Sequence, residues 1–183
     1  KGMMFCSQAL TQVLLHEYER SQGCFLVDIG GSSSKISFIK NNRIQYSVVT
    51  PMGGNIITPD IATCLNISFS EAERIKILYG SLALNCVNPQ DTIDILCNKN
   101  GRKKIKLLLL CQIIESRVRE LSNFLIKKIP LISDPSYNIV IGGGGSLQKG
   151  LLLFFKHYLN RNTRESALDP KSIMGNTSYH TAI

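Results

Sequence analysis

The sequence has no tryptophan, and its six cysteines and three histidines lie far apart along 183 residues. No two cysteines show the Cys-x-x-Cys spacing, and no histidine stands at metal-ligand spacing from a cysteine. This pattern argues against a structural zinc site, and it predicts reduced, buried thiols and histidines without a catalytic role. The residues concerned are Cys6, Cys24, Cys64, Cys86, Cys97, Cys111, His16, His157 and His180.

Long apolar runs are also missing. The run Leu151–Phe155 ends at Lys156, far below the ~18 residues that a membrane-spanning helix requires. The first residues lack the basic-then-apolar order of a signal peptide, and the sequence starts at Lys1 rather than at methionine. We therefore expect a segment of a longer protein that does not cross a membrane.

Acidic residues are few, since 13 Asp and Glu stand against 21 Lys and Arg and leave a net charge of +8. The densest basic cluster is Lys99, Arg102, Lys103, Lys104 and Lys106. It has no interleaved aromatic residues, which are the usual stacking platforms for single-stranded nucleic acids. The cluster predicts a solvated basic loop or, if it binds a partner, an acidic peptide or anionic lipid. We expect no nucleic acid partner.

Two glycine-rich strand ends, more than a hundred residues apart, are the most informative feature. The first strand brings Asp28 to its end and continues into Gly30-Gly31, and the second runs from Asn138 into Gly142–Gly145. Glycines let the backbone turn tightly enough for N–H groups to converge on an anion.

A helical pattern at Leu147–Leu159 follows the second strand end and would place a helix N-terminus beside a ligand. Taken alone, the first segment is equally typical of a hairpin and the second of a flexible joint. Together the two segments predict a split nucleotide site.

Periodicity predicts a helix and then a strand meander at the start of the chain. Apolar residues recur at helical spacing in Met3–Arg20, and Gly23 ends the pattern. The turn Asn41-Asn42 joins the last two strands of an antiparallel meander. The three strands are expected at Phe25–Ile29, Lys35–Ile39 and Ile44–Val49.

Residues 55–80 change to helical spacing. Thr58 or Asp60 is expected to cap a helix Ile61–Leu65. A capping box of Ser70 and Glu73 would begin a helix Glu71–Leu78, which Gly80 ends. Two short helices are therefore predicted.

Weak strands at Val87–Leu96 and the basic loop come next. An apolar stripe with a Glu115–Arg119 pair on its outer side then predicts one long amphipathic helix. The stripe is Leu110, Ile114, Val118, Leu121, Leu125 and Ile129. We expect the sheet of residues 25–50 and the strand 139–141 to form one layer, with residues 61–134 inserted as a lobe.

Four segments stand in the order found in actin-like ATPases. They are Asp28–Ser33, Gly53–Ala62, Ala72–Lys76 and Gly142–Gly145. Together with the ending Ser178–Ile183, they make the whole chain resemble the FtsA family of bacterial cell division proteins. The resemblance implies an α/β fold of the actin-like ATPase (ribonuclease H-like) type. Residues 24–60 and 135–183 would be subdomain IIA, residues 61–134 a smaller inserted α/β subdomain IIB, and residues 1–23 a linking helix.

The resemblance also implies ATP and Mg²⁺ as cofactors. In that family the segment of Asp28 is the second phosphate loop, and Asp28 would hold Mg²⁺ through water as the sole catalytic candidate. Glu73 and Lys76 would flank the adenosine, where a carboxylate and an ammonium one helical turn apart offer an acceptor and a donor. The further nucleotide contacts implied are Gly30, Gly31, Ser32, Ser33, Gly53, Gly142, Gly143, Gly144 and Gly145.

The chain departs from the family pattern at the phosphate loop. The family reads Asp-x-Gly-Gly-Gly-Thr with an acidic residue two positions on, whereas this chain has Ser32, Ser33 and Lys35. We therefore expect at most a weak ATPase. The family's first phosphate loop and its membrane-anchoring C-terminal helix are missing from the sequence, so we expect this segment alone to bind ATP weakly or not at all.

The function implied is that of a self-assembling adaptor, on the cytoplasmic face of the cell membrane at the division site. It would bind the C-terminal tail of FtsZ through the lobe 61–134, contact other division proteins, and use the nucleotide as a conformational switch. Three alternatives remain open. They are an FtsA-like pilus-assembly ATPase, an actin-fold small-molecule kinase or phosphatase, and a basic nucleic-acid-binding domain with strongly salt-dependent binding.

Overall fold

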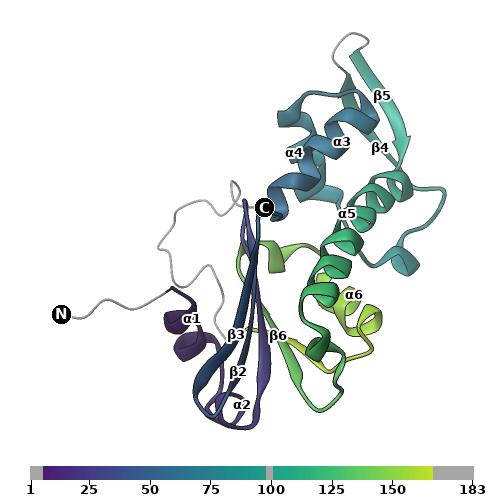
Figure 1. The fold of residues 1–183 in the computed structure, drawn as a ribbon. Helices are drawn as coiled ribbons and strands as arrows, with labels where there is room; N and C mark the ends of the chain where they lie inside the picture. Colours follow the sequence, from purple (N-terminus) through teal and green to yellow (C-terminus); the bar gives the residue numbers. More distant parts are fainter. Residues whose placement is uncertain (1–5, 98–100, 167–183) are drawn as a thin grey trace.

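The computed structural model describes residues 6–97 and 101–166 and shows a sheet-based body with an elongated lobe (Figure 1). A five-stranded sheet has the order β3-β2-β1-β6-β7, and a two-stranded sheet pairs β4 with β5. The helices are α1 (Cys6–Leu14), α2 (Glu17–Gln22), α3 (Ile57–Leu65), α4 (Phe69–Tyr79), α5 (Leu107–Lys128) and α6 (Leu151–Tyr158). The strands are β1 (Cys24–Ile29), β2 (Ser34–Lys40), β3 (Arg43–Thr50), β4 (Thr92–Cys97), β5 (Gly101–Lys106), β6 (Asn138–Gly142) and β7 (Thr163–Glu165). Short 3-10 turns are η1 (Gly54–Ile56), η2 (Leu84–Cys86), η3 (Pro130–Ser133) and η4 (Gly144–Leu147).

The predicted antiparallel meander is confirmed. Strand β1 pairs with β2 and β2 with β3, both antiparallel. Asn41 and Asn42 have φ values of 53° and 60° in the turn between β2 and β3. Two consecutive left-handed residues match the twist of a tight hairpin, and asparagine tolerates this conformation well.

The two glycine-rich strands lie in one sheet, as predicted, and they are direct neighbours in it. Strand β6 runs parallel to β1, with Cys24 opposite Asn138 and Asp28 opposite Gly142. Parallel neighbours bring their carboxyl ends to the same edge of the sheet. The chain between β3 and β6 forms the crossover, and it contains α3, α4, β4, β5 and α5.

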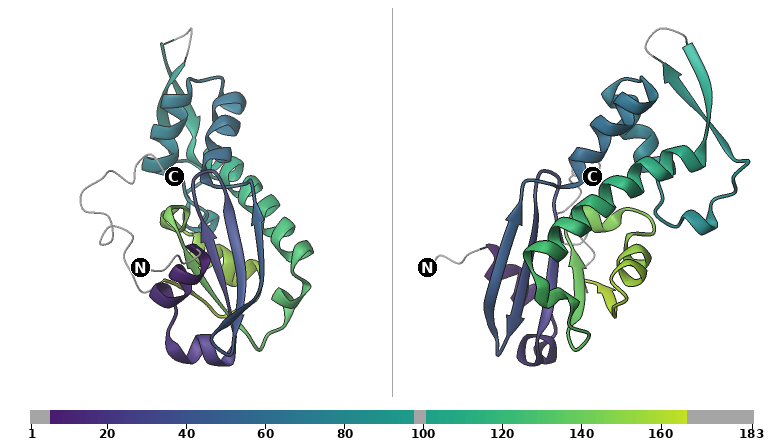
Figure 2. Two further views of the ribbon diagram at one scale, coloured as in Figure 1. Left: turned by 60° about the vertical axis from the view of Figure 1, so that its left-hand side comes forward. Right: turned by 45° about the vertical axis from the view of Figure 1, so that its right-hand side comes forward.

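Helices cover both faces of the sheet (Figure 2). On one face, Leu14 and Leu15, in and just after α1, pack with Cys24, Leu26 and other side chains of the sheet. On the other face, the alternate residues of β1 join the core formed with α5 and α6. The alternation of strand side chains explains this two-sided burial.

The long helix α5 connects the lobe with the sheet (Figures 1 and 2). The predicted helix and its apolar stripe are confirmed, since all six stripe residues are buried. The outer pair is also present, with Arg119 Nη2 donating to Glu115 Oε1 at 2.5 Å.

In the lobe, the buried Glu71 of α4 accepts from the backbone N–H of Leu96 in β4 at 2.9 Å. Helix α4 and the β4–β5 hairpin are thereby joined.

The predicted starts of the two lobe helices were wrong. Helix α3 begins at Ile57, so that Thr58 and Asp60 lie within it rather than capping it. Helix α4 begins two residues early, because Ser68 rather than Ser70 is the N-cap and accepts from the N–H of Glu71. Serines at both positions compete for the same role, and Glu73 is consequently not part of the cap.

The ends of the chain also differ from prediction. In the described residues, the single N-terminal helix becomes α1 and α2, because His16 is extended and its N–H donates to Glu19 at 2.8 Å. The glycines after β6 continue into the 3-10 turn η4, and α6 begins only at Leu151. The second glycine segment therefore does not place an α-helix N-terminus directly beside its loop.

Two further sequence predictions were wrong. The basic cluster is not a loop, since Arg102, Lys103, Lys104 and Lys106 lie on strand β5, while Lys99 lies outside the described residues. Of the weak strands expected in Val87–Leu96, one is present, namely β4. Of the described thiols, all free, Cys24 and Cys111 are buried, but Cys64 and Cys86 are exposed.

Candidate functional site

The glycine segment after β6 passes very close to the end of β1. Gly143 has a φ of 84°, which L-residues with a Cβ adopt only at a cost. A Cβ at this position would lie 2.5 Å from Asp28 Oδ1 and would also collide with the carbonyl of Ile29. Glycine is therefore required for this loop to approach the carboxylate.

A second glycine contact joins the β1–β2 turn to the segment after β3. The N–H of Gly54 donates to the carbonyl of Gly30 at 2.9 Å, and that of Asn55 donates to Gly31 at 2.8 Å. A Cβ on Gly53 would lie 2.5 Å from the Gly30 oxygen. Within the turn, the N–H of Gly30 is already used, since it donates to the carbonyl of Ser33 at 2.9 Å.

Most of the residues predicted for the second phosphate loop and for the adenosine loop are thus brought together at one edge of the sheet. Gly145 packs against Ile29, and Ser32 and Ser33 are exposed at the turn. The residues that converge are Asp28, Gly30, Gly31, Gly53, Gly142, Gly143 and Gly145. Gly144 lies between Gly143 and Gly145 and begins η4.

Asp28 is half-buried at this edge. Burial raises the pKa of the Asp28 carboxyl, and the positive charge of Lys35 opposes this effect. Among the described residues no group of three His, Cys, Asp or Glu side chains comes together to hold a metal. Asp28 therefore has no second and third side chain of these types beside it within the described ranges.

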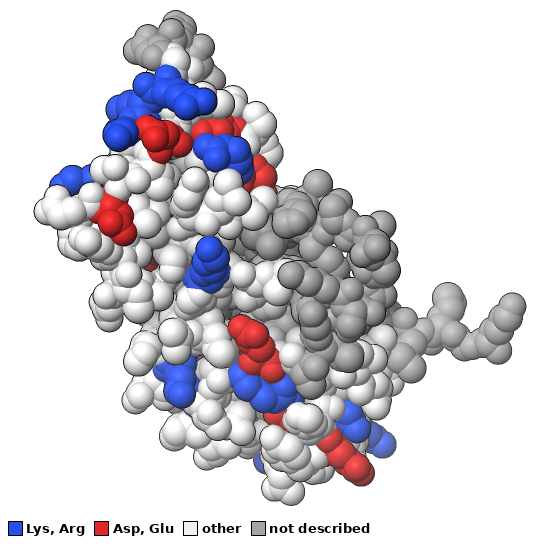
Figure 3. All heavy atoms as spheres, turned by 180° about the vertical axis from the view of Figure 1, so that it is seen from behind, with Lys and Arg blue, Asp and Glu red and all other residues white. Residues whose placement is uncertain are grey.

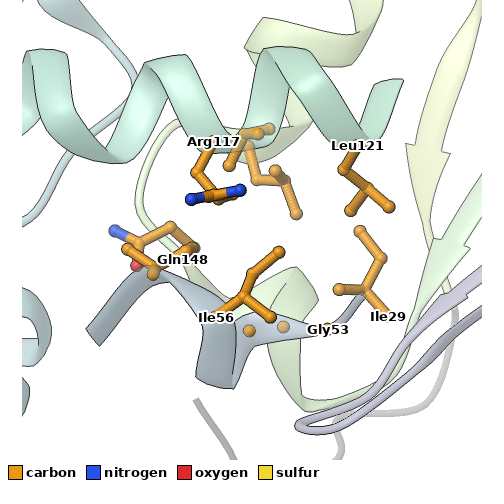
Figure 4. A pocket seen from close by; sticks show the side chains of 11 residues that line it. Ile29, Gly53, Ile56, Arg117, Leu121 and Gln148 are labelled. Atoms are coloured by element: carbon orange, nitrogen blue, oxygen red, sulfur yellow. The ribbon is translucent and has the colours of Figure 1, made fainter. Parts of the chain in front are cut away.

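A small cavity of about 30 Å³ lies behind the glycine segments (Figure 4). Ile29, Gly53 and Ile56 face Leu121 of α5 across it, with Arg117 and Gln148 at the side. Its lining is almost wholly apolar, and its volume is close to that of one water molecule. The cavity is therefore lined mainly by apolar side chains, and it is too small for a ligand much larger than water.

The predicted nucleoside contacts form a second polar cluster between α3 and α4. Lys76 Nζ donates to Glu73 Oε2 and to Thr58 Oγ1, both at 2.8 Å, and the Thr58 hydroxyl donates to the same Glu73 oxygen. Lys76 is 0% exposed, and burial lowers its pKa while Glu73 opposes that effect. Glu73 keeps 22% of its side chain exposed, but its second oxygen, Oε1, is buried and has no partner among the described residues.

Helix α4 is tied to the loop that follows the second glycine segment. Gln148 Nε2 donates to the carbonyl of Gly80 at 2.9 Å, and the N–H of Leu82 donates to the carbonyl of Lys149 at 2.8 Å. The cluster of Thr58, Glu73 and Lys76 is therefore connected with both glycine segments. One connection runs through α3 and the other runs through Gly80.

Sequence reasoning missed two residues of this region. Thr58 was interpreted as a helix cap, yet it is a buried hydroxyl that joins Lys76 and Glu73. Arg117, on the polar side of α5, reaches α3 and donates to Asp60 at 2.5 Å. The spacing of residues within one helix cannot reveal either contact, because Thr58 of α3 bonds to side chains of α4, and Arg117 of α5 bonds to a side chain of α3.

Residues 25–183 match the sequence pattern of the family described as "Cell division protein FtsA". The chain is 30% identical over 144 residues to the FtsA protein of Enterococcus faecalis, covering 76% of this chain and 32% of that one. It is 27% identical over 189 aligned residues to FtsA of Escherichia coli strain K12, covering 97% and 44%. The chain thus spans less than half the length of these relatives.

Solved structures show the same fold. MreB 5 of Spiroplasma citri bound to AMPPNP matches with a TM-score of 0.69 and 19% identity, covering 87% of this chain and 53% of that one. A PilM-PilN type IV pilus biogenesis complex matches with a TM-score of 0.60 and 18% identity, covering 92% and 44%. The predicted actin-like ATPase fold is confirmed. Because the family pattern covers 159 of the 183 residues, from 25 to 183, the chain belongs to the FtsA family of cell division proteins.

Proposed function

We propose that this chain carries part of an ATP site along the carboxyl edge of β1 and β6. The observation that supports it is the convergence of two glycine segments on Asp28, with a loop so close that Gly143 admits no Cβ. Backbone that turns this tightly presents N–H groups rather than side chains to a ligand. The β- and γ-phosphates would lie at Gly30–Ser33 and Gly53, and the adenosine at Gly142–Gly145.

Asp28 would hold Mg²⁺ through water, and the ion would neutralise phosphate charge. Glu73 is the better placed of the two α4 side chains to contact the nucleoside, because 22% of its side chain is exposed whereas Lys76 is 0% exposed. The Lys76 ammonium donates to Glu73 and Thr58 instead. We therefore propose that Lys76 acts mainly by orienting Glu73.

The experiment for the ATP site is a titration of the full-length protein with ATP, followed by calorimetry. Gly143→Ala adds a methyl group that collides with Ile29 and Asp28, so we expect ATP affinity to fall by about tenfold or more. Gly101→Ala is the matched control, because Gly101 also has a positive φ, 69°, but nothing within 4 Å. Equal ATP affinities of Gly143→Ala and Gly101→Ala would contradict the proposal that the glycine segments form an ATP site.

We propose further that the lobe of residues 61–134 binds the C-terminal tail of FtsZ. The β4–β5 hairpin supports this proposal, since Arg102, Lys104 and Lys106 alternate along β5 on its outer face. The exposed residues Leu96 and Asp94 of β4 lie on the same face, which therefore keeps an excess of positive charge. Figure 3 shows basic side chains near the end of this lobe, with acidic side chains beside them. Cations beside an apolar side chain suit a peptide that is both acidic and apolar.

A fluorescent peptide with the FtsZ tail sequence tests this surface. Arg102→Glu with Lys104→Glu should weaken binding by about tenfold or more, and the same charge change at Lys127, on α5, should leave it unchanged. Binding that is indifferent to the hairpin charges would contradict the assignment. Absence of binding by the folded wild type would favour a pilus-type partner instead.

The wider role is proposed from family membership. Within residues 6–97 and 101–166, no helix combines the length and apolar character that a membrane crossing requires. In the proposal, a helix beyond this chain attaches the protein to the cytoplasmic face of the membrane at the division site. The two halves of the actin-like fold would close over ATP and favour self-assembly, so that the nucleotide acts as a switch.

A further inference from the structure

Lys35 lies directly opposite Asp28 in the register of β1 and β2. Residues directly opposite in antiparallel strands point to the same face, with Cβ atoms about 5 Å apart. Lys35 is the second residue of β2, immediately after the turn Gly30–Ser33. Its four-carbon side chain therefore starts at the base of the proposed phosphate loop, on the same face as the carboxylate.

The row of residues across the sheet at this level holds one anion and one cation. Val49 is opposite Lys35 on β3, and Gly142 is opposite Asp28 on β6. Neither neighbour carries a charge. The row thus has a formal charge of zero, whereas an acid at position 35 would make it −2.

The ammonium of Lys35 is not used within the described residues. It forms neither an ion pair within 4 Å nor a hydrogen bond there, although its charge acts on Asp28. Lys35 is also only half-buried, so its head group reaches solvent at low cost. By contrast, Lys76 is fully buried and has two partners.

These charges change what a phosphate group meets at the loop. A carboxylate repels phosphate, and a divalent cation normally compensates for that repulsion. We propose that the Lys35 ammonium supplies part of this compensation, so that the chain binds nucleoside di- and triphosphates with little dependence on Mg²⁺. The inference rests on the ATP site proposed above and goes beyond it by stating how that site is charged.

Isothermal titration of the full-length protein with ATP, once in excess Mg²⁺ and once in excess EDTA, tests the proposal. The ratio of the two dissociation constants is the quantity of interest. We expect the wild type to show a ratio below about 3, and Lys35→Asp to show a ratio of about ten or more, because two carboxylates then face the phosphates. Lys35→Gln, which only removes the charge, should give an intermediate ratio.

Lys127→Asp is the control for net charge, since Lys127 lies exposed near the end of α5. It should keep the wild-type ratio. Circular dichroism melting shows whether each variant is folded, and Lys35→Gln keeps the test decisive if Lys35→Asp does not fold.

The outcomes separate the two proposals. Wild-type binding that needs Mg²⁺, with the same ratio in Lys35→Gln, would overturn the inference and leave the ATP site intact. Absence of ATP binding by the folded wild type under both conditions would overturn the ATP site and the inference with it.

Discussion

The sheet edge and the α3–α4 cluster hold their charged groups in opposite ways. At the sheet edge, Asp28 and Lys35 face each other without forming an ion pair. In the α3–α4 cluster, Lys76 and Glu73 are joined directly and share the Thr58 hydroxyl. Charges left unpaired are available to a ligand, whereas paired and buried charges fix a structure. In the functions proposed above, the sheet edge binds the ligand and the α3–α4 cluster orients Glu73.

The largest effect is expected from breaking the buried pair. Glu73→Ala leaves the Lys76 ammonium in the core without its carboxylate, and Lys76 is 0% exposed. We expect the free energy of unfolding to fall by about 3 kcal/mol, measured by urea denaturation of the full-length protein.

Glu120→Ala provides the matched control for this loss. Glu120 is paired with Arg117 at 2.6 Å, but 58% of its side chain is exposed. Exposed pairs contribute less than about 1 kcal/mol. Similar losses of unfolding free energy in Glu73→Ala and Glu120→Ala would contradict the structural role given to the buried Lys76–Glu73 pair.

A smaller effect, of opposite sign, is expected at the sheet edge. Burial raises the pKa of Asp28 above its ordinary value of 3.8. Between 3.8 and the higher folded-state pKa the folded protein binds more protons than the unfolded chain, so this carboxyl lowers stability as pH rises through that window. Asp28→Asn should remove that part of the pH dependence and raise stability at neutral pH.

Thermal melting of wild type and Asp28→Asn across the acid range measures this effect. A variant less stable than the wild type at neutral pH would show that Asp28 stabilises the fold. That result would remove the contrast with the buried pair, because both regions would then serve stability.

Local patterns predicted much of the fold. Alternating strands around Asn41-Asn42 predicted the meander, and the stripe ending at Ile129 predicted α5, because both signals lie within a few turns of chain. The two matching glycine-rich ends predicted that the strands of Asp28 and Gly142 belong to one layer, and their direct pairing confirms it.

The predictions that were wrong concern residues with two equally good candidates for one role, or residues whose contacts lie far away in the sequence. Ser68 and Ser70 are equally good caps in the sequence, and only the position of Glu71 against Leu96 distinguishes them in the fold. The cations of β5 suggested a loop, but Ile105 among them is buried and pairs with Ile93. The role of Thr58 required the contact between α3 and α4, which no spacing within one helix reveals.

The proposed nucleotide site is best tested by ATP titration of the full-length wild type beside Gly143→Ala and Gly101→Ala. We expect saturable binding by the wild type and Gly101→Ala, and binding at least about tenfold weaker in Gly143→Ala. Equal binding by all three folded proteins, or none by the wild type, would show that the converging glycine segments are not a nucleotide site.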